Sequence, residues 1–201
     1  MNIKLFTAIV FAAVMTVCNT QAQSIVAQDA TAEDYIKLLN NVGYQVYSFD
    51  ISSMEKDKYG FIPVIMKYEN GKVTNLLQVF DDFGFAFTNS EPKFVINISQ
   101  EDECSVRCEY KFDKTCGFDT SFKFKKVKGH YGYKRKPFVI PDEFKTDEFI
   151  PLVAISSYWY DKEDKMIRNC DVNEFDKDYL NTATFKYSPL IYVIGVKCKK
   201  M

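Results

Sequence analysis

The sequence predicts a mainly β fold, either an antiparallel two-layer sandwich or a partly closed barrel, with one α-helix near the N-terminus. Three observations lead to this prediction. Residues 44–199 are rich in Phe, Tyr, Val and Ile, in short runs separated by turn residues, which favours strands over helices. An Asn-Gly pair, Asn70-Gly71, lies between two such runs. The helical spacing of apolar residues is visible only ahead of this region, before Gly43.

The predicted helix begins after Thr31. Thr31 and Asp34 have the spacing of a capping box, in which each side chain accepts a hydrogen bond from the backbone N–H of the other residue. Gly43 is placed to end the helix as a C-terminal cap. Apolar side chains repeat at helical spacing between these signals, at Ala32, Tyr35, Ile36 and Leu39.

The clearest pair of strands is a hairpin over residues 61–80. Residues 61–68 and 72–80 form its strands and Glu69-Asn70-Gly71 its turn, because Asn-Gly adopts the positive φ angles that tight hairpin turns require. So many strands cannot lie in one flat sheet, and two layers are therefore expected. The other predicted strands are residues 44–52, 83–88, 93–99, 121–127, 131–140, 149–160, 165–171 and 190–199.

The first residues have the pattern of a cleavable secretory signal peptide. Lys4 supplies the positive start, and the apolar run over residues 5–17 is too short to span a bilayer. Small residues at Thr20 and Ala22 then mark a cleavage site before Gln23. We expect residues 1–22 to be the signal peptide and residues 23–201 to be a single β-rich domain.

The protein is therefore expected in an exported location, in the periplasm or at the cell surface and beyond. A lipid anchor at Cys18 is not favoured, because Val17 stands where a lipoprotein signal has a small residue. No later stretch has the ~20 apolar residues of a membrane helix. The chain has 26 Lys and Arg against 27 Asp and Glu, and this balance argues against a dedicated nucleic-acid binder.

Five cysteines follow the predicted cleavage site: Cys104, Cys108, Cys116, Cys170 and Cys198. In an oxidising compartment they predict up to two disulfides and one leftover thiol. Cys104 and Cys108 would stand too far apart on one extended strand to bridge each other. Cys116 is therefore expected to pair with Cys104 or Cys108, and Cys170 with Cys198. A zinc site is not expected, because paired short Cys-x2-Cys spacings are missing.

Residues 122–136 are the most unusual segment and are predicted to form a basic hairpin. Phe122 and Phe124 alternate with Lys123 and Lys125, which places the rings in the core and the ammonium groups in solvent. Such a surface suits an anionic polysaccharide, anionic envelope lipid or an acidic protein. The alternative is that the lysines only protect an exposed strand from aggregation. The candidate ligand-binding residues are Lys123, Lys125, His130, Tyr131, Tyr133, Lys134 and Arg135.

A second candidate surface is Tyr158, Trp159 and Tyr160. Exposed aromatic side chains can stack on sugar rings, and Trp159 is the only tryptophan. The preceding strand is apolar on both faces, as in a buried sandwich strand. Packing in the core or at its rim is therefore the alternative interpretation of these side chains.

No motif indicates catalysis or a cofactor. The chain lacks a Gly-x-Ser-x-Gly elbow and a phosphate-binding glycine-rich loop, and His130 is the only histidine, which excludes a histidine-based metal cluster within one chain. We predict an exported, non-catalytic binding or envelope-accessory protein that recognises glycan or anionic envelope material. The alternatives are a small secreted hydrolase, with an acidic pair or a Cys/His couple, and a structural protein–protein interaction module.

The signal-peptide end Gln21-Ala22-Gln23, the composition rich in Lys, Asn, Phe and Tyr, and the β-rich body resemble secreted domains of unknown function from gut Bacteroidetes. This resemblance implies an envelope or secreted location in a bacterium that lives among polysaccharides. It brings no functional residue with it.

Overall fold

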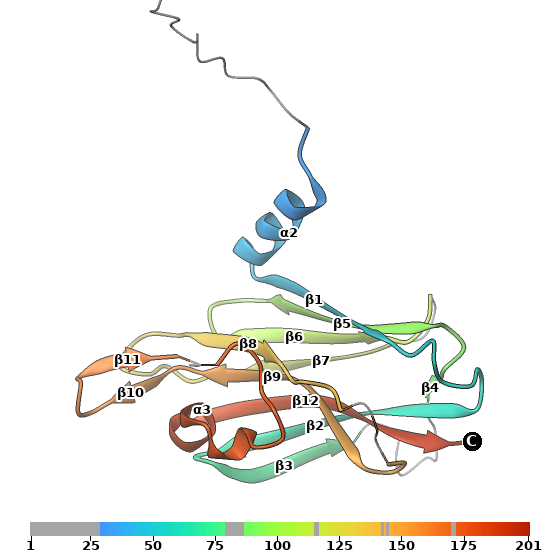
Figure 1. Ribbon diagram of the computed structural model, residues 1–201. Helices are drawn as coiled ribbons and strands as arrows, with labels where there is room; N and C mark the ends of the chain where they lie inside the picture. Colours follow the sequence, from blue (N-terminus) through green and yellow to red (C-terminus); the bar gives the residue numbers. More distant parts are fainter. Residues whose placement is uncertain (1–28, 79–86, 115–116, 142, 144, 170–171) are drawn as a thin grey trace, which may run out of the picture. The chain divides into compact units, whose positions relative to one another are not determined.

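The computed structural model describes residues 29–78, 87–114, 117–141, 143, 145–169 and 172–201 (Figure 1). The chain divides into two compact units, Met1–Tyr35 and Ile36–Met201, and the second unit contains both large sheets. The fold is mainly β and antiparallel, with two layers as in a sandwich and no closed barrel among the described strands. The fold-class prediction is therefore confirmed in its sandwich form.

Helix α2, Ala32–Asn41, begins and ends at the predicted signals. The backbone N–H of Thr31 donates to Asp34 Oδ2 at 2.8 Å, and the N–H of Asp34 donates to Thr31 Oγ1 at 3.3 Å. These two bonds form the capping box. Gly43 has a φ of 76°, in the left-handed region that glycine adopts at a helix C-terminus.

The first large sheet has four antiparallel strands in the order β1-β5-β6-β7. Its register places Phe49 opposite Phe94 and Tyr110 opposite Ile96. The buried residues of β6 alternate with exposed or half-buried charged residues, so one face of this sheet lies in the core. The strands are β1 (Tyr44–Asp50), β5 (Lys93–Gln100), β6 (Ser105–Lys111) and β7 (Gly117–Lys123).

The second large sheet has the order β3-β2-β12-β9-β8, with β4 paired to β2. Strand β12 lies at its centre and pairs over most of its length with β2 and β9. A separate pair, β10 and β11, extends beyond this sheet (Figure 1). The bounds are β2 (Tyr59–Glu69), β3 (Lys72–Gln78), β4 (Phe87–Thr88), β8 (Tyr133–Pro137), β9 (Phe149–Ser157), β10 (Trp159–Asp161), β11 (Met166–Arg168) and β12 (Leu190–Lys200).

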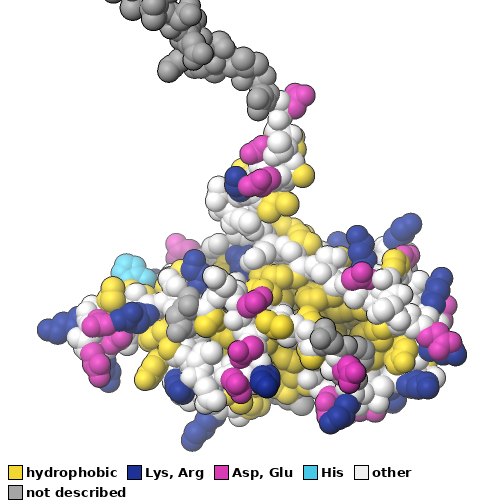
Figure 2. Space-filling view, in the orientation of Figure 1, with side chains coloured by type: hydrophobic (Ala, Val, Ile, Leu, Met, Phe, Trp, Pro, Cys, Tyr) yellow, Lys and Arg dark blue, Asp and Glu magenta, His cyan; other side chains and the backbone are white. Residues whose placement is uncertain are grey.

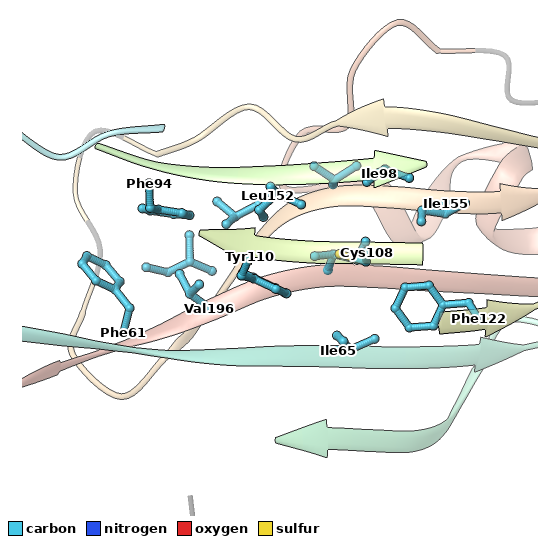
Figure 3. Packing of buried hydrophobic residues seen from close by; sticks show 14 of the residues in the cluster. Phe61, Ile65, Phe94, Ile98, Cys108, Tyr110, Phe122, Leu152, Ile155 and Val196 are labelled. Carbon is cyan, nitrogen blue, oxygen red and sulfur yellow. The ribbon is translucent and has the colours of Figure 1, made fainter. Parts of the chain in front are cut away.

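The central strands of the second sheet are buried on both faces, because each face packs against a different layer. Along β12, Ile194 and Val196 face the first sheet, whereas Ile191 and Val193 face the segment that carries the short helices η2 (Tyr179–Asn181) and α3 (Ala183–Tyr187). Figure 3 shows the larger core, in which rings and aliphatic side chains from both sheets meet. A central strand buried on both sides explains the nearly uninterrupted apolar sequence of β12.

The Asn70-Gly71 hairpin is confirmed. Asn70 and Gly71 both have positive φ, 50° and 75°, and Glu69 pairs with Lys72 across the turn. Two positive φ angles in a two-residue loop match the right-handed twist of the flanking strands. Residues 79 and 80 of the predicted second strand lie outside the described residues, as do residues 83–86 of the next predicted strand.

Three elements were not predicted: β6, the first half of β7, and the segment with η2 and α3. The strand predicted over residues 149–160 is divided into β9 and β10. The strand predicted over residues 165–171 is shorter, because β11 spans only Met166–Arg168. Residues 170 and 171 lie outside the described part of the chain.

A tyrosine connects the two sheets inside the core. Tyr110 of β6 is fully buried, and its hydroxyl donates to the carbonyl of Gly195 in β12 at 2.9 Å. This carbonyl lies where the register between β12 and β9 shifts, between Ile194 and Gly195. A β-carbon at Gly195 would lie 2.2 Å from the carbonyl oxygen of Ile150. The close approach of β9 to β12 at this bulge therefore requires glycine.

We expect Gly195→Ala to lower the free energy of unfolding by about 2 kcal/mol or more, because the new methyl group must push β9 away from β12. Urea denaturation measures the loss. Gly129→Ala is the comparison, since a β-carbon there meets nothing within 4 Å and only the positive φ opposes it, at about 1 kcal/mol. Equal losses for the two variants would contradict this role of Gly195.

Candidate functional site

The predicted basic hairpin over residues 122–136 is not formed, and this prediction is wrong. Strand β7 pairs with β6 in the first sheet, whereas β8 pairs with β9 in the second. Residues 124–132 are the connection between the two sheets, and we call them the crossover loop. At its tip, Lys128 and Gly129 both have positive φ, and Val127 and His130 exchange two backbone hydrogen bonds, at 2.8 and 3.1 Å. Only this tight turn is formed within the predicted hairpin.

The crossover loop brings the two predicted surfaces together. Gly132 accepts a hydrogen bond from the backbone N–H of Tyr158 at 2.9 Å, and the Tyr158 ring occupies the space that a side chain at position 132 would need. The ammonium group of Lys128 lies 4.6 Å from the centre of the Tyr160 ring. The basic segment and the aromatic segment, which are separate in the sequence, are therefore parts of one surface.

Two lysines of this loop stand over tyrosine rings. Besides Lys128 over Tyr160, Lys126 lies 4.9 Å from the centre of the Tyr131 ring. Such cation–π contacts hold the ammonium groups in place without neutralising them. Neither lysine forms an ion pair with an acidic residue in the described part of the chain. Figure 2 shows the only histidine, in cyan, and several dark blue cations at the end of the second unit where β10 and β11 lie.

Open hollows flank strand β10. One, of about 510 Å³, is lined by Trp159, Asp161, Met166, Ile167, Arg168, Asn169, Ala183 and Tyr187. A second, of about 340 Å³, is lined by Trp159, Tyr160, Asp161, Lys162, Glu163 and Tyr187. They share Trp159, Asp161 and Tyr187, so one aromatic surface continues from one hollow into the other. We call the surface formed by Lys128, Trp159, Tyr160, Arg168 and Tyr187 the β10 surface.

The aromatic residues of the β10 surface differ in exposure. Trp159 is only 5% exposed, whereas Tyr187 is 65% exposed. Tyr160 is half-buried beneath Lys128. Trp159 therefore acts as a wall of the hollows rather than as an exposed platform, and the accessible rings belong to the tyrosines.

Ion pairs fix the polar part of the β10 surface. The Arg168 Nε donates to Asp161 Oδ2 at 2.6 Å, and its guanidinium also contacts the Asp164 carboxylate. The hydrogen bond from Arg168 lowers the pKa of Asp161 below its usual value. A carboxyl group kept ionised in this way is not suited to act as a general acid, so this acidic pair gives the hydrolase alternative no support.

The thiol of Cys104 lies beside the crossover loop. Its pKa is raised by a hydrogen bond with Asp102, by burial and by the Asp102 charge. Tyr131 contacts the same thiol, and its own pKa is raised by burial and by Cys104. A thiol whose pKa is raised is a poor nucleophile, so Cys104 gives the Cys/His alternative no support.

Arg135 and Tyr133, although predicted as ligand-binding residues, make internal contacts. The Arg135 guanidinium donates to the carbonyls of Gly43 and Ile98, at 2.9 and 3.4 Å, and it lies 5.3 Å from the centre of the Tyr133 ring. It thereby connects β8 of the second sheet with the edge of the first.

The remaining lysines of the prediction are Lys123, Lys125 and Lys134. They are exposed and form no ion pair among the described residues.

Cys104, Cys108 and Cys198 are free thiols in the structure. The disulfides predicted for these residues are therefore not formed in it. Cys108 and Cys198 are fully buried in the core between the sheets, where they pack as small apolar side chains. Their predicted partners, Cys116 and Cys170, lie outside the described residues.

Sequence reasoning missed several residues of the site: Asp161 and Arg168 as an ion pair, Lys126 and Lys128 as the cations on tyrosine rings, and Tyr187. Lys126 and Lys128 belong to the predicted basic segment, so its lysine-rich sequence could have identified them. Nothing in the sequence points to Tyr187, because only the fold brings it to the same hollows as Trp159. The described residues contain no cluster of three or more His, Cys, Asp or Glu side chains placed to hold a metal ion, and none of the described helices is long and apolar enough to cross a membrane.

The fold and the site together define a sandwich-like antiparallel β protein with a cationic and aromatic surface at the end that carries β10. Comparison with protein families matches residues 14–200 to a domain of unknown function, DUF5041. The chain belongs to this family, and the resemblance to domains of unknown function is confirmed. Comparisons with curated proteins and with solved structures find no match.

Tyr47 supplies a test of the packing between Arg135 and the first sheet. Its hydroxyl is buried and has no hydrogen-bond partner among the described residues, and burial raises its pKa to about 12. Because the folded protein holds this proton more tightly than the unfolded chain, the stability it contributes is complete below about pH 10 and is lost as the pH rises to about 12.

We expect the free energy of unfolding, measured by urea denaturation from pH 8 to pH 12, to decline across this window. The decline should be less steep in Tyr47→Phe, which should also be more stable by about 1 kcal/mol at neutral pH, because no unpaired hydroxyl is then buried. Parallel profiles of the two proteins would show that Tyr47 is not the titrating group.

Proposed function

We propose that the protein is an exported, non-catalytic glycan-binding protein and that its ligand is an anionic polysaccharide bound at the β10 surface. The observation that carries the proposal is the position of Lys128 over Tyr160, beside hollows lined by Trp159 and Tyr187. Tyrosine rings offer flat faces for the C–H groups of a sugar, and an ammonium group that lacks an acidic partner attracts a carboxylate or sulfate.

The charges around the surface support an acidic ligand on the Lys128 side. Arg168 is occupied by Asp161 and Asp164, so its charge is largely compensated. Asp102 and Glu103 lie near Tyr131 and reduce the positive potential around Lys126. Lys128 is thus the cation best placed to meet an anionic group of a sugar that stacks on Tyr160.

The open shape of the hollows supports binding rather than catalysis. An active site usually encloses its reacting groups and shifts their pKa values toward neutrality. Here the carboxyl pKa of Asp161 is lowered by Arg168, and the hollows are lined by ring faces and fixed ion pairs. A shallow aromatic surface of this kind fits one or two sugar units of a longer chain.

Export is part of the proposal and is tested separately. We expect the full chain, expressed in a bacterium with a secretory pathway, to lose residues 1–22 and to begin at Gln23. Intact-mass spectrometry of the protein recovered from the periplasm or the medium measures this. Recovery of the uncleaved chain in the cytoplasm would contradict export, and a mass consistent with a lipidated Cys18 would contradict the proposed cleavage site.

The glycan proposal is tested on an array of neutral and anionic polysaccharides at low and high salt, with the exported protein. We expect binding to anionic glycans that weakens at high salt, because screening reduces the contribution of Lys128. Lys128→Glu should weaken this binding about tenfold, and Tyr160→Ala and Tyr187→Ala should each weaken it to a similar extent through lost stacking.

Lys93→Glu is the matched control, because Lys93 is an exposed lysine at the start of β5, away from the residues that line the hollows. It should leave glycan binding unchanged. Equal effects of Lys93→Glu and Lys128→Glu would show that net charge, and not the β10 surface, determines binding. Absence of binding to every glycan at low salt would reject the proposal.

A further inference from the structure

A separate cavity opens between the two sheets, at the ends of strands β1, β2, β5 and β9 that lie away from β10. It has a volume of about 340 Å³, within the range of about 300–1,000 Å³ typical of ligand pockets. Figure 2 shows hydrophobic side chains, in yellow, along the face of the second unit between its sheets. The cavity is lined by Ser48, Phe49, Asp50, Ile51, Ser53, Met54, Phe61, Phe94, Ile140, Pro141, Ile150, Leu152 and Val196.

The deep wall of this cavity is entirely apolar. Phe61, Phe94, Leu152 and Val196 are each at most 3% exposed, and they come from both sheets (Figure 3). Phe49 stacks on Phe94 with ring centres 5.0 Å apart. The polar residues of the lining, Ser48, Asp50 and Ser53, all belong to β1 or the loop that follows it. A wall of this kind favours a hydrocarbon group, because no polar group of a ligand would find a partner there.

The loop that forms the outer wall is held in place by hydrogen bonds. The N–H of Ile51 donates to the carbonyl of Pro92 at 2.8 Å. Asn89, which is only 4% exposed, accepts from the N–H of Tyr59 and donates to the carbonyl of Glu55. The cavity is therefore preformed, and a ligand need not order the loop in order to bind.

A polar hollow adjoins the apolar cavity across Ile51 and Met54, which line both. It has a volume of about 350 Å³ and is also lined by Ser52, Lys56, Asn89, Ser90, Glu91 and Pro92. An apolar cavity beside a polar hollow matches the two parts of an amphiphile. The opposite charges of Lys56 and Glu91 in the hollow, together with Asp50 at the cavity, favour a neutral or zwitterionic headgroup over an anionic one.

From this arrangement we infer that the cavity binds the aliphatic chain of an amphiphile, with its neutral or zwitterionic headgroup in the adjoining polar hollow. This site is separate from the β10 surface and does not depend on glycan binding. The chain can come from a free amphiphile or from a membrane lipid, since both present the same hydrocarbon group to Phe61 and Phe94.

The test uses the exported protein and a series of octyl, decyl and dodecyl dimethylamine oxides, each below its critical micelle concentration, in isothermal titration calorimetry. These probes contain no sugar, so the outcome does not depend on whether the β10 surface binds glycan. We expect saturable binding with an affinity that rises about fourfold for each added methylene until the cavity is filled. No saturable binding, or an affinity that does not depend on chain length, would overturn the inference.

Two variants at neighbouring residues test whether the amphiphile binds in this cavity. Ile140 lines the cavity and is 41% exposed, whereas Val139 is 50% exposed and does not line it. Ile140→Asp should weaken decyl binding at least tenfold, because it puts a charge at the apolar wall, and Val139→Asp should leave it unchanged. Equal losses in the two variants, with both proteins folded by circular dichroism, would overturn the assignment to this cavity.

A second arm distinguishes the source of the chain. The protein is incubated with phosphatidylcholine vesicles, separated from them by flotation, and extracted for mass spectrometry. Phosphatidylcholine in the vesicle-free protein would support a membrane lipid as the ligand. Amine oxide binding without lipid uptake would support a free amphiphile.

Discussion

The hydrogen bond from Tyr110 to the carbonyl of Gly195 sets the relation between the two sheets. Tyr110 lies in the first sheet and Gly195 in the second, and both are in the core, so this bond fixes the face of β12 against β6 where no water competes. Gly195 also allows β9 to approach β12 at the bulge. The register of β9 against β12 in turn sets the position at which β9 ends, and β10 begins two residues after that end. The position of Trp159 therefore depends on a glycine and a tyrosine far from it in the sequence.

The two ends of the sandwich are chemically different because different kinds of connection lie there. At one end the crossover loop passes from the first sheet to the second, and its Lys128 lies over Tyr160 of β10. At the other end, the loop after β1 is held by Asn89 over apolar side chains that the strands leave accessible. The hollows beside β10 are lined mainly by residues of β10, β11 and α3, whereas residues of the loop after β1 line the cavity at the other end.

The features predicted correctly from the sequence are those determined by neighbouring residues. The capping box at Thr31 and the Asn70-Gly71 turn each depend on a few adjacent positions, so local rules suffice. Strand β6 could also have been predicted, since Val106, Cys108 and Tyr110 alternate with charged residues. Helix α3 spans only five residues, too few to show a helical period. The basic hairpin was wrong because alternation identifies strands but does not say which strand each one pairs with, and β7 and β8 entered different sheets.

Trp159 illustrates how burial limits what the site can do. A tryptophan that is 5% exposed offers a sugar little of its ring, so its main contribution is to form a wall of the hollows beside β10. The faces available to a ligand are then those of Tyr160 and Tyr187, with the Lys128 ammonium group above one of them. Stacking on two tyrosines and one ionic contact provides only a few kcal/mol after the costs of association. A single sugar would therefore bind weakly, and a repeating polysaccharide, which can rebind at successive units before it diffuses away, is the ligand for which such a shallow surface is effective.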